Sequence, residues 1–336
     1  MGSKRLLSGV FWLASLLLAE GAARLIFPAA LAEFVPSENP RLVYELNPGY
    51  PGVNRFGMRQ DDFDPSELRN RFVIAVIGDS HTYSSGSPNP AHAFPARLEY
   101  HLHERGVKDA VVLNFGVQGY DMVQELQVLQ TRALRFSPNL IVLQYCINDD
   151  HIPNFIQPRF PALNQAMHKS VLLTTAWTTV LYSTFGRAHL IPLVDRAPDV
   201  LLFVPGLVGT PRSREQGTGH GFTHPTRDKD LVPARYREFV GRDNLEHAVQ
   251  QFGDICLRER IPALATGFIE RADEVVYERA GFQVYSFFTM FEGTDMRRYG
   301  YDPQVTDGHF QPQGNDFIGN ALAKYITAHV GMTRTP

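Results

Sequence analysis

The sequence predicts an α/β fold, a three-layer α/β/α sandwich around a mainly parallel sheet, preceded by one N-terminal transmembrane helix. Three observations predict it. Short apolar runs rich in β-branched residues alternate with amphipathic segments, polar residues directly follow several of these runs, and a long apolar stretch opens the chain. Strands that alternate with helices in this way pair in parallel through right-handed crossovers.

The composition limits the number of domains and the kinds of partner and site to expect. A chain of 336 residues with 44% hydrophobic and 20% charged residues can form one large domain or two modest ones. A net charge of -3 offers no basic field to hold phosphate backbones, which argues against a nucleic-acid partner. Cys146 and Cys256 lie far apart without metal-type spacing, so neither a zinc site nor a disulfide-rich scaffold is expected. Whether the two cysteines pair stays open.

The first element is the apolar stretch of residues 1–27. Lys4 and Arg5 precede it, and it continues from Leu6 to Phe27 with Glu20 as its main interruption. At about 1.5 Å per residue this length crosses a hydrocarbon core of about 30 Å. The flanking positive charges stay inside the cell, so the rest of the chain is expected on the extracytoplasmic, or periplasmic, side.

Two interpretations of this stretch stay open. A retained single-pass membrane anchor is favoured by the length of the span. A cleaved signal peptide is the alternative, because the apolar core follows two positive charges and Ala30-Leu31-Ala32 provides a small-x-small cleavage site.

Residues 28–70 are expected to form a linker that packs on the following domain. This segment contains several prolines, including Pro36, Pro40 and Pro48, and is not expected to be a domain of its own. Its apolar side chains, such as Tyr44 and Phe56, can be buried against that domain.

The predicted domain covers residues 71–335. Its expected strands are continuous apolar runs, typical of a sheet covered on both faces, and lie at Phe72–Ile77, Ala110–Phe115, Leu140–Cys146, Pro262–Phe268 and Phe282–Phe287. Its expected helices follow the amphipathic pattern and lie at Phe94–Glu104, Met122–Phe136 and Pro312–His329.

Residues 151–237 interrupt this alternation and are interpreted as an insertion. It is expected to hold one or two helices and a mobile loop, and to serve either as packing or as a lid or wall facing the substrate. The apolar stretch Ala166–Leu193 could be taken for a second membrane span, but Lys169, Arg187 and many hydroxyl side chains favour a soluble helix.

Candidate chemistry collects where the predicted strands end. The first strand leads into Gly78-Asp79-Ser80, the second into Asn114–Gly119 and the third into Cys146–Asp149, while Asp307-Gly308-His309 precedes the last helix. In parallel sheets the carboxyl ends of the strands meet at one edge. A serine nucleophile needs a base to take its proton and donors to hold an oxyanion, and this set offers a candidate for each part.

In these blocks and their order, the chain resembles the SGNH hydrolases, also called GDSL-type esterases, from about Arg71 to Val330. The resemblance implies that Ser80 is the nucleophile, His309 the general base and Asp307 the carboxylate that orients it. It also implies an oxyanion hole made of the N–H groups of Ser80 and Gly119 and the side-chain amide of Asn148.

Two features depart from the family pattern. Cys146 and Ile147 precede Asn148 where glycine is usual, and Cys146 is interpreted as a buried apolar residue. The acid and base stand two residues apart instead of three, and an extended backbone between them would still place both side chains on one side. If that geometry fails, His309 takes its orientation from a backbone carbonyl and the site is a dyad. Asp79 and His81, although adjacent to Ser80, are not expected to be its catalytic partners.

Together with the N-terminal apolar stretch, the resemblance implies an exported, membrane-anchored serine esterase that hydrolyses an O-acetyl or acyl ester, with no metal and no organic cofactor. Its expected partners are a small-molecule, glycan or lipid ester and the membrane. One alternative is an O-acyltransferase acting on a cell-envelope polysaccharide, since both reactions share the acyl-enzyme. Another is a non-catalytic binding or assembly protein on the same fold. The physiological substrate and the oligomeric state stay open.

Overall fold

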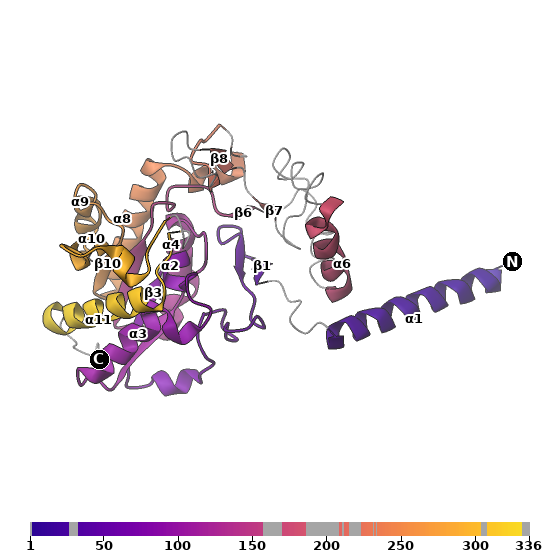
Figure 1. Ribbon diagram of the computed structural model, residues 1–336, viewed down its shortest axis with the longest axis horizontal. Helices are drawn as coiled ribbons and strands as arrows, with labels where there is room; N and C mark the ends of the chain where they lie inside the picture. The colour runs from indigo at the N-terminus through magenta and orange to yellow at the C-terminus, as the bar shows by residue number, and fades with distance from the viewer. Residues whose placement is uncertain are drawn as a thin grey trace. The chain divides into compact units, whose positions relative to one another are not determined.

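The computed structural model describes residues 2–26, 33–156, 170–185, 208–209, 212–214, 223–230, 232, 234–303 and 308–330 (Figure 1). The chain forms two compact units. The first comprises Met1–Glu38, Val43–Pro51 and Phe155–Thr210, and the second comprises Asn39–Leu42, Gly52–Asn154 and Pro211–Pro336.

The second unit is built on a five-stranded sheet with the order β11-β10-β5-β3-β4. Every neighbouring pair is parallel, as predicted. All residues of β3, which lies between β5 and β4, are buried, because helices cover both faces of the sheet. The strands are β3 (Phe72–Ile77), β4 (Ala110–Asn114), β5 (Leu140–Tyr145), β10 (Ala263–Gly267) and β11 (Gln283–Val284).

Two helices, α3 (Phe94–Glu104) and α11 (Pro312–His329), lie side by side and cover one face of the sheet (Figure 1). Alternate β3 residues, Ile74 and Val76 among them, join the buried side chains of both helices in one core. The two helices approach closely at Gly319, where a Cβ would lie 2.7 Å from the backbone of Arg97. On the other side, α4 (Met122–Thr131) packs on β3 and on α8 (Arg242–Glu259), which completes the third layer.

Shorter elements connect these layers. The short helices of the second unit are α2 (Ser80–Tyr83), α9 (Glu274–Arg279) and α10 (Phe287–Met290), and its 3₁₀ turns are η1 (Pro65–Leu68), η2 (Pro90–His92), η3 (Ala133–Phe136), η5 (Ala234–Phe239) and η6 (Met296–Tyr299). A small antiparallel pair joins β8 (Arg212–Arg214) to β9 (Thr223–Pro225).

The first unit contains the N-terminal helix α1 (Gly2–Ile26), the antiparallel pairs β1 (Phe34–Pro36) with β2 (Tyr44–Leu46) and β6 (Phe155–Ile156) with β7 (Val208–Gly209), and helix α6 (Val171–Tyr182). The rings of Phe34, Tyr44 and Phe155 pack together, with centroids 5.0 to 5.6 Å apart. Within the described residues, one stretch, Ser8–Ile26, is long and apolar enough to cross a membrane, and its side chains are largely exposed.

Parts of the predicted insertion, including residues 157–169, 186–207 and 215–222, lie outside the described residues. The insertion at 151–237, its expected loop and the domain boundaries at residues 27 and 70 therefore stay predictions. α6 lies within the predicted helical stretch Ala166–Leu193.

Candidate active site

The first loop of the site follows β3 and carries Ser80. Gly78 leads out of the strand, and a Cβ there would overlap Thr82 Oγ1 and come within 2.7 Å of Gln144 Oε1. Asp79 caps the next turn, its Oδ1 accepting from the backbone N–H of His81 at 2.9 Å. Ser80 is therefore the first residue of the short helix α2, held at the carboxyl edge of the sheet.

His309 reaches this serine from the far end of the chain. Its Nε2 lies 2.8 Å from Ser80 Oγ, within hydrogen-bond distance. For the hydroxyl to donate to Nε2, the imidazole proton must be on Nδ1, which is the tautomer that a general base needs. The structure thus brings together the predicted nucleophile and the predicted base.

The predicted acid, Asp307, lies outside the described residues. The residue between it and the histidine, Gly308, has a φ of 72°, in the left-handed region. The backbone before His309 therefore turns at Gly308 and is not extended at that residue. Asp307 keeps its role as a prediction.

A second carboxylate, Asp79, also faces the nucleophile. Its Oδ2 lies 3.1 Å from Ser80 Oγ, so the hydroxyl has two acceptors within reach, this oxygen and the imidazole nitrogen of His309. Asp79 is completely buried. Asp79 was not expected to be a triad partner, and its contact with Ser80 was not predicted from the sequence.

His81 forms the wall behind the base. Its ring centroid lies 5.1 Å from that of His309 and equally far from that of Phe268. Burial, opposed by the Asp79 charge and assisted by His309, lowers the pKa of His81 to about 4. His81 is therefore neutral near pH 7, and its ring packs beside the site against the rings of His309 and Phe268.

The second loop follows β4 and is bonded to the first. The Asn114 side chain accepts from Gly116 N–H at 2.9 Å and donates to the Thr82 carbonyl at 3.1 Å, while Val117 N–H donates to the Gly78 carbonyl at 3.1 Å. These bonds bring the loop of Gly119 to the same sheet edge as the nucleophile.

Gly119 itself has a φ of 71°, a conformation that favours glycine. A Cβ at this position would overlap the amide of Asn154 and come within 2.8 Å of the Asn154 Cβ. The Asn154 backbone N–H also donates to the Gly119 carbonyl at 3.4 Å. Asn154 was not predicted as a site residue, because no local sequence pattern links it to a loop that lies far upstream.

The third loop follows β5 and carries Asn148. Its amide Nδ2 donates to the Tyr120 carbonyl at 3.3 Å, which links it to the loop of Gly119. Asp149 supports the turn, since its Oδ2 accepts from Cys146 N–H at 3.1 Å and its carbonyl accepts from Met122 N–H. The two predicted oxyanion donors other than Ser80 thus lie on loops that contact each other.

Three buried carboxyl groups lie behind these loops. Burial raises the pKa of Asp121, Glu125 and Asp149 well above the usual range, and for Glu125 and Asp149 the neighbouring carboxylates add to the rise. Both Glu125 carboxyl oxygens are buried, and neither has a hydrogen-bond partner among the described residues. Burial therefore favours the protonated form of these groups relative to an exposed carboxyl group.

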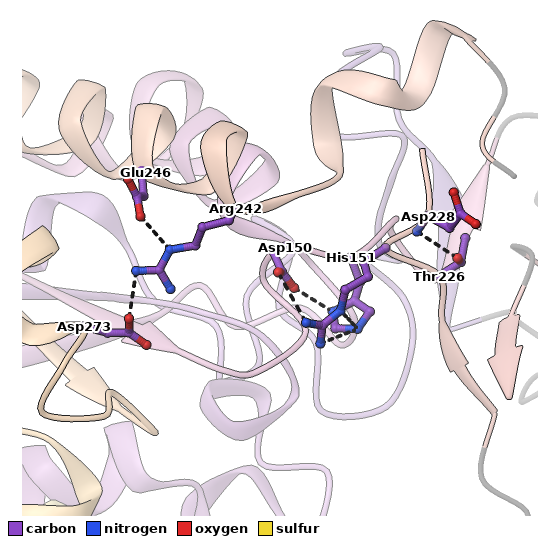
Figure 2. A network of polar contacts seen from close by, with 8 residues as sticks. Asp150, His151, Thr226, Asp228, Arg242, Glu246 and Asp273 are labelled. Carbon is purple, nitrogen blue, oxygen red and sulfur yellow. Dashed lines mark hydrogen bonds and ion pairs between the residues drawn. The ribbon is translucent and has the colours of Figure 1, made fainter. Parts of the chain in front are cut away.

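A second histidine and carboxylate pair lies farther along the third loop (Figure 2). His151 Nδ1 and Asp150 Oδ1 are 3.0 Å apart, and the guanidinium of Arg227 lies 3.3 to 3.4 Å from His151 Nε2. Burial alone would raise the pKa of Asp150, but its contacts with His151 and Arg227 lower it. Because Arg227 occupies the free nitrogen of His151, this pair anchors the loop and offers no base to a serine.

Neither cysteine is a candidate nucleophile. Cys146 and Cys256 are both buried and free, so they do not pair. Burial raises the pKa of the Cys146 thiol well above its usual value and that of Cys256 to about 12. Across the described part of the chain, no group of three or more histidine, cysteine, aspartate or glutamate side chains could hold a metal ion.

A profile of the GDSL-like lipase/acylhydrolase family matches residues 76–317, which contain every predicted site residue. The chain belongs to this family. As a GDSL-like acylhydrolase, it has the fold and the general activity class, ester hydrolysis, that the sequence predicted. A comparison with curated proteins finds no match.

Solved structures of a lipolytic protein, an esterase and a lipase/acylhydrolase match this chain at low sequence identity. A putative lipolytic protein of the G-D-S-L family from Desulfitobacterium hafniense is 10% identical, with 76% of this chain and 99% of that chain covered and a TM-score of 0.39. A psychrotrophic esterase from Pseudoalteromonas is 8% identical, with coverage of 76% and 97% and a TM-score of 0.42. A lipase/acylhydrolase from Enterococcus faecalis is 16% identical, with coverage of 78% and 99% and a TM-score of 0.33.

Proposed function

We propose that this protein is an exported, membrane-anchored serine esterase that hydrolyses an O-acetyl or acyl ester through an acyl-enzyme on Ser80. The observation that carries the proposal is the 2.8 Å contact between His309 Nε2 and Ser80 Oγ in a chain of the GDSL-like family. A serine hydroxyl is a weak nucleophile until a positioned base removes its proton, and this contact supplies the base.

In the first half-reaction, Ser80 Oγ attacks the ester carbonyl while its proton passes to His309 Nε2. The carbonyl oxygen becomes an oxyanion and accepts hydrogen bonds from the N–H groups of Ser80 and Gly119 and from the Asn148 amide. The imidazolium then gives its proton to the leaving alcohol as the carbon–oxygen bond breaks. The acyl group remains on Ser80, and the alcohol departs.

In the second half-reaction, His309 takes a proton from water as the water oxygen attacks the acyl-enzyme. Collapse of the tetrahedral intermediate returns that proton to Ser80 Oγ and releases the carboxylic acid. Asp307 is proposed to hold the imidazole proton on Nδ1 throughout. A polysaccharide hydroxyl in place of water would give the acyltransferase, so the second step decides between the two reactions.

The membrane anchor is proposed from α1. Its apolar stretch Ser8–Ile26 remains largely exposed, whereas an apolar helix in the core of a soluble protein is buried. Lys4 and Arg5 precede this stretch and favour an orientation with the catalytic unit outside the cytoplasm.

Turnover of short aryl esters by the full-length protein in detergent tests the proposal. We expect hydrolysis of p-nitrophenyl acetate that Ser80→Ala abolishes and Ser85→Ala retains, since Ser85 is an exposed serine one turn later. Product analysis with and without an O-acetylatable glycan then compares acid release with acyl transfer. Folded wild-type protein without Ser80-dependent turnover would overturn the enzyme assignment, and transfer in excess of hydrolysis would overturn the esterase assignment.

A further inference from the structure

The carboxylate of Glu20, in helix α1, caps the first turn of helix α6. Its Oε2 accepts from Ser170 Oγ at 2.7 Å and from Leu172 N–H at 3.0 Å, and its Oε1 accepts from Val171 N–H at 2.9 Å. Arg24 Nε donates to the same Oε1 at 2.8 Å. The start of α6 is thus fixed to a defined point on α1.

That point lies within Ser8–Ile26, the stretch of α1 able to cross a membrane. Ionisable side chains at such positions are costly unless they are paired, and the donors of α6 together with Arg24 supply the pairing. Glu20 is six residues before Ile26, which is about 9 Å along a helix axis. If α1 spans the bilayer, α6 begins near the outer membrane–water interface.

The outward face of α6 suits contact with lipid. Leu173 is 47% exposed and Val180 is 46% exposed, and their spacing of two helical turns places them on one face together with the exposed Ala176. No charged residue occurs between Ser170 and Phe185. The Thr179 hydroxyl donates to the Thr175 carbonyl at 2.8 Å, so this polar group is satisfied within the helix.

We infer that α6 is an interfacial membrane helix, with the Leu173–Val180 face covered by the lipid bilayer. The inference rests on the proposed membrane anchoring through α1. With 12 residues, α6 is about 18 Å long, too short to cross a hydrocarbon core of about 30 Å. It therefore lies along the interface, which differs from both interpretations of Ala166–Leu193 drawn from the sequence, the soluble helix and the second span.

Fluorescence quenching in vesicles tests this inference on the full-length protein. Three variants would each carry one added cysteine, labelled with an environment-sensitive nitrobenzoxadiazole dye. They are Leu17→Cys in α1, Val180→Cys in α6 and Val275→Cys on the exposed surface of α9. Cys146 and Cys256 are buried, and the wild-type chain labelled in parallel sets the background. In vesicles of phosphatidylethanolamine and phosphatidylglycerol, we expect a blue shift and quenching by doxyl lipids at positions 17 and 180, but not at 275.

The possible results distinguish the interfacial helix α6 from the membrane anchor α1 on which that inference rests. Quenching at position 17 without quenching at position 180 would overturn the interfacial helix and leave the anchor intact. The absence of quenching at both positions would overturn the anchor and the inference together, and Ser80-dependent ester turnover measured on the same samples reports separately on the catalytic proposal. Adding Glu20→Ala to the position 180 reporter is expected to reduce its quenching, whereas Arg24→Ala, which leaves the bonds to α6 in place, is expected to retain it.

Discussion

Replacing Gly119 by alanine perturbs the proposed oxyanion hole with a single methyl group. The added Cβ would overlap the Asn154 amide, and the φ of 71° would place alanine in the left-handed region. That conformation costs a residue with a Cβ about 1–3 kcal/mol of stability. Displacement of the residue 119 N–H removes one oxyanion donor, which costs about 2.7–4 kcal/mol in the transition state, or about 100- to 1000-fold in kcat.

The assay is kcat/KM for p-nitrophenyl acetate, with the thermal midpoint Tm measured on the same samples. Gly106→Ala is the matched control, because its φ of 91° imposes similar backbone strain while nothing lies within 4 Å of the added Cβ. We expect both variants to lose stability and only Gly119→Ala to lose activity on this scale. In the double variant Gly119→Ala/Asn154→Ala the overlap with the Asn154 amide is removed and only the 2.8 Å approach to the residue 154 Cβ remains, so part of the activity should return. If Gly119→Ala stays as active as Gly106→Ala, the assignment of Gly119 to the oxyanion hole is wrong.

Three further predictions follow from the buried groups and the triad. Asp307→Asn is expected to lower kcat by up to about 10⁴-fold, as loss of the orienting carboxylate does in a triad, and a loss below about tenfold would favour a Ser80–His309 dyad. Because the native pKa of Glu125 is raised, the folded state binds more protons than the unfolded state between the usual glutamate pKa and the raised one, and stability falls as pH rises through that window. Urea unfolding should therefore show that the free energy of unfolding of Glu125→Gln rises relative to that of wild type as pH rises, by about 1.4 kcal/mol per pH unit within that window, and parallel curves would contradict this. The contribution of His81 to the pH dependence of stability has the opposite sign. Its pKa falls from 6.5 to about 4 on folding, so stability is lost as pH falls through that range. His81→Gln should remove about 3 kcal/mol of that dependence, and an unchanged slope would count against burial of a neutral imidazole.

The helices and strands that the sequence predicted correctly are each defined by a clear local pattern of apolar residues. β3, α3 and α11 have the predicted ends, because a continuous apolar run or an amphipathic pattern with proline in the first turn defines each of them. The predicted strand Phe282–Phe287 is instead reduced to Gln283–Val284, because Ser286 caps helix α10 by accepting from Thr289 N–H. The spacing of apolar residues cannot show whether the buried Phe287 belongs to a helix or to a strand.

The predicted helix Met122–Phe136 also differs from the structure. α4 ends at Thr131, and the chain continues as the 3₁₀ turn η3 after Arg132, whose φ of -128° and ψ of -61° interrupt the helix. No proline or glycine marks this break, so helix propensity gave no signal of it.

The site was predictable to the extent that its residues follow strands. Ser80, Gly119 and Asn148 each lie just beyond a strand of the parallel sheet, and their shared edge follows from the topology. The pairing of Ser80 with His309 was implied by the resemblance to the SGNH hydrolases, and the contact at 2.8 Å agrees with it. The contacts of Asp79 with Ser80 and of Asn154 with Gly119 depend on side-chain directions in loops, which no sequence period encodes.

Covalent labelling of Ser80 tests the central claim most directly. The full-length protein would be treated with a fluorophosphonate and analysed by intact-mass and peptide mass spectrometry, beside Ser80→Ala, Ser85→Ala and His309→Gln. We predict one adduct per chain, located on Ser80, absent from Ser80→Ala, unchanged in Ser85→Ala and slower to form in His309→Gln. Folded wild-type protein that stays unlabelled, or an adduct that persists in Ser80→Ala, would contradict the account.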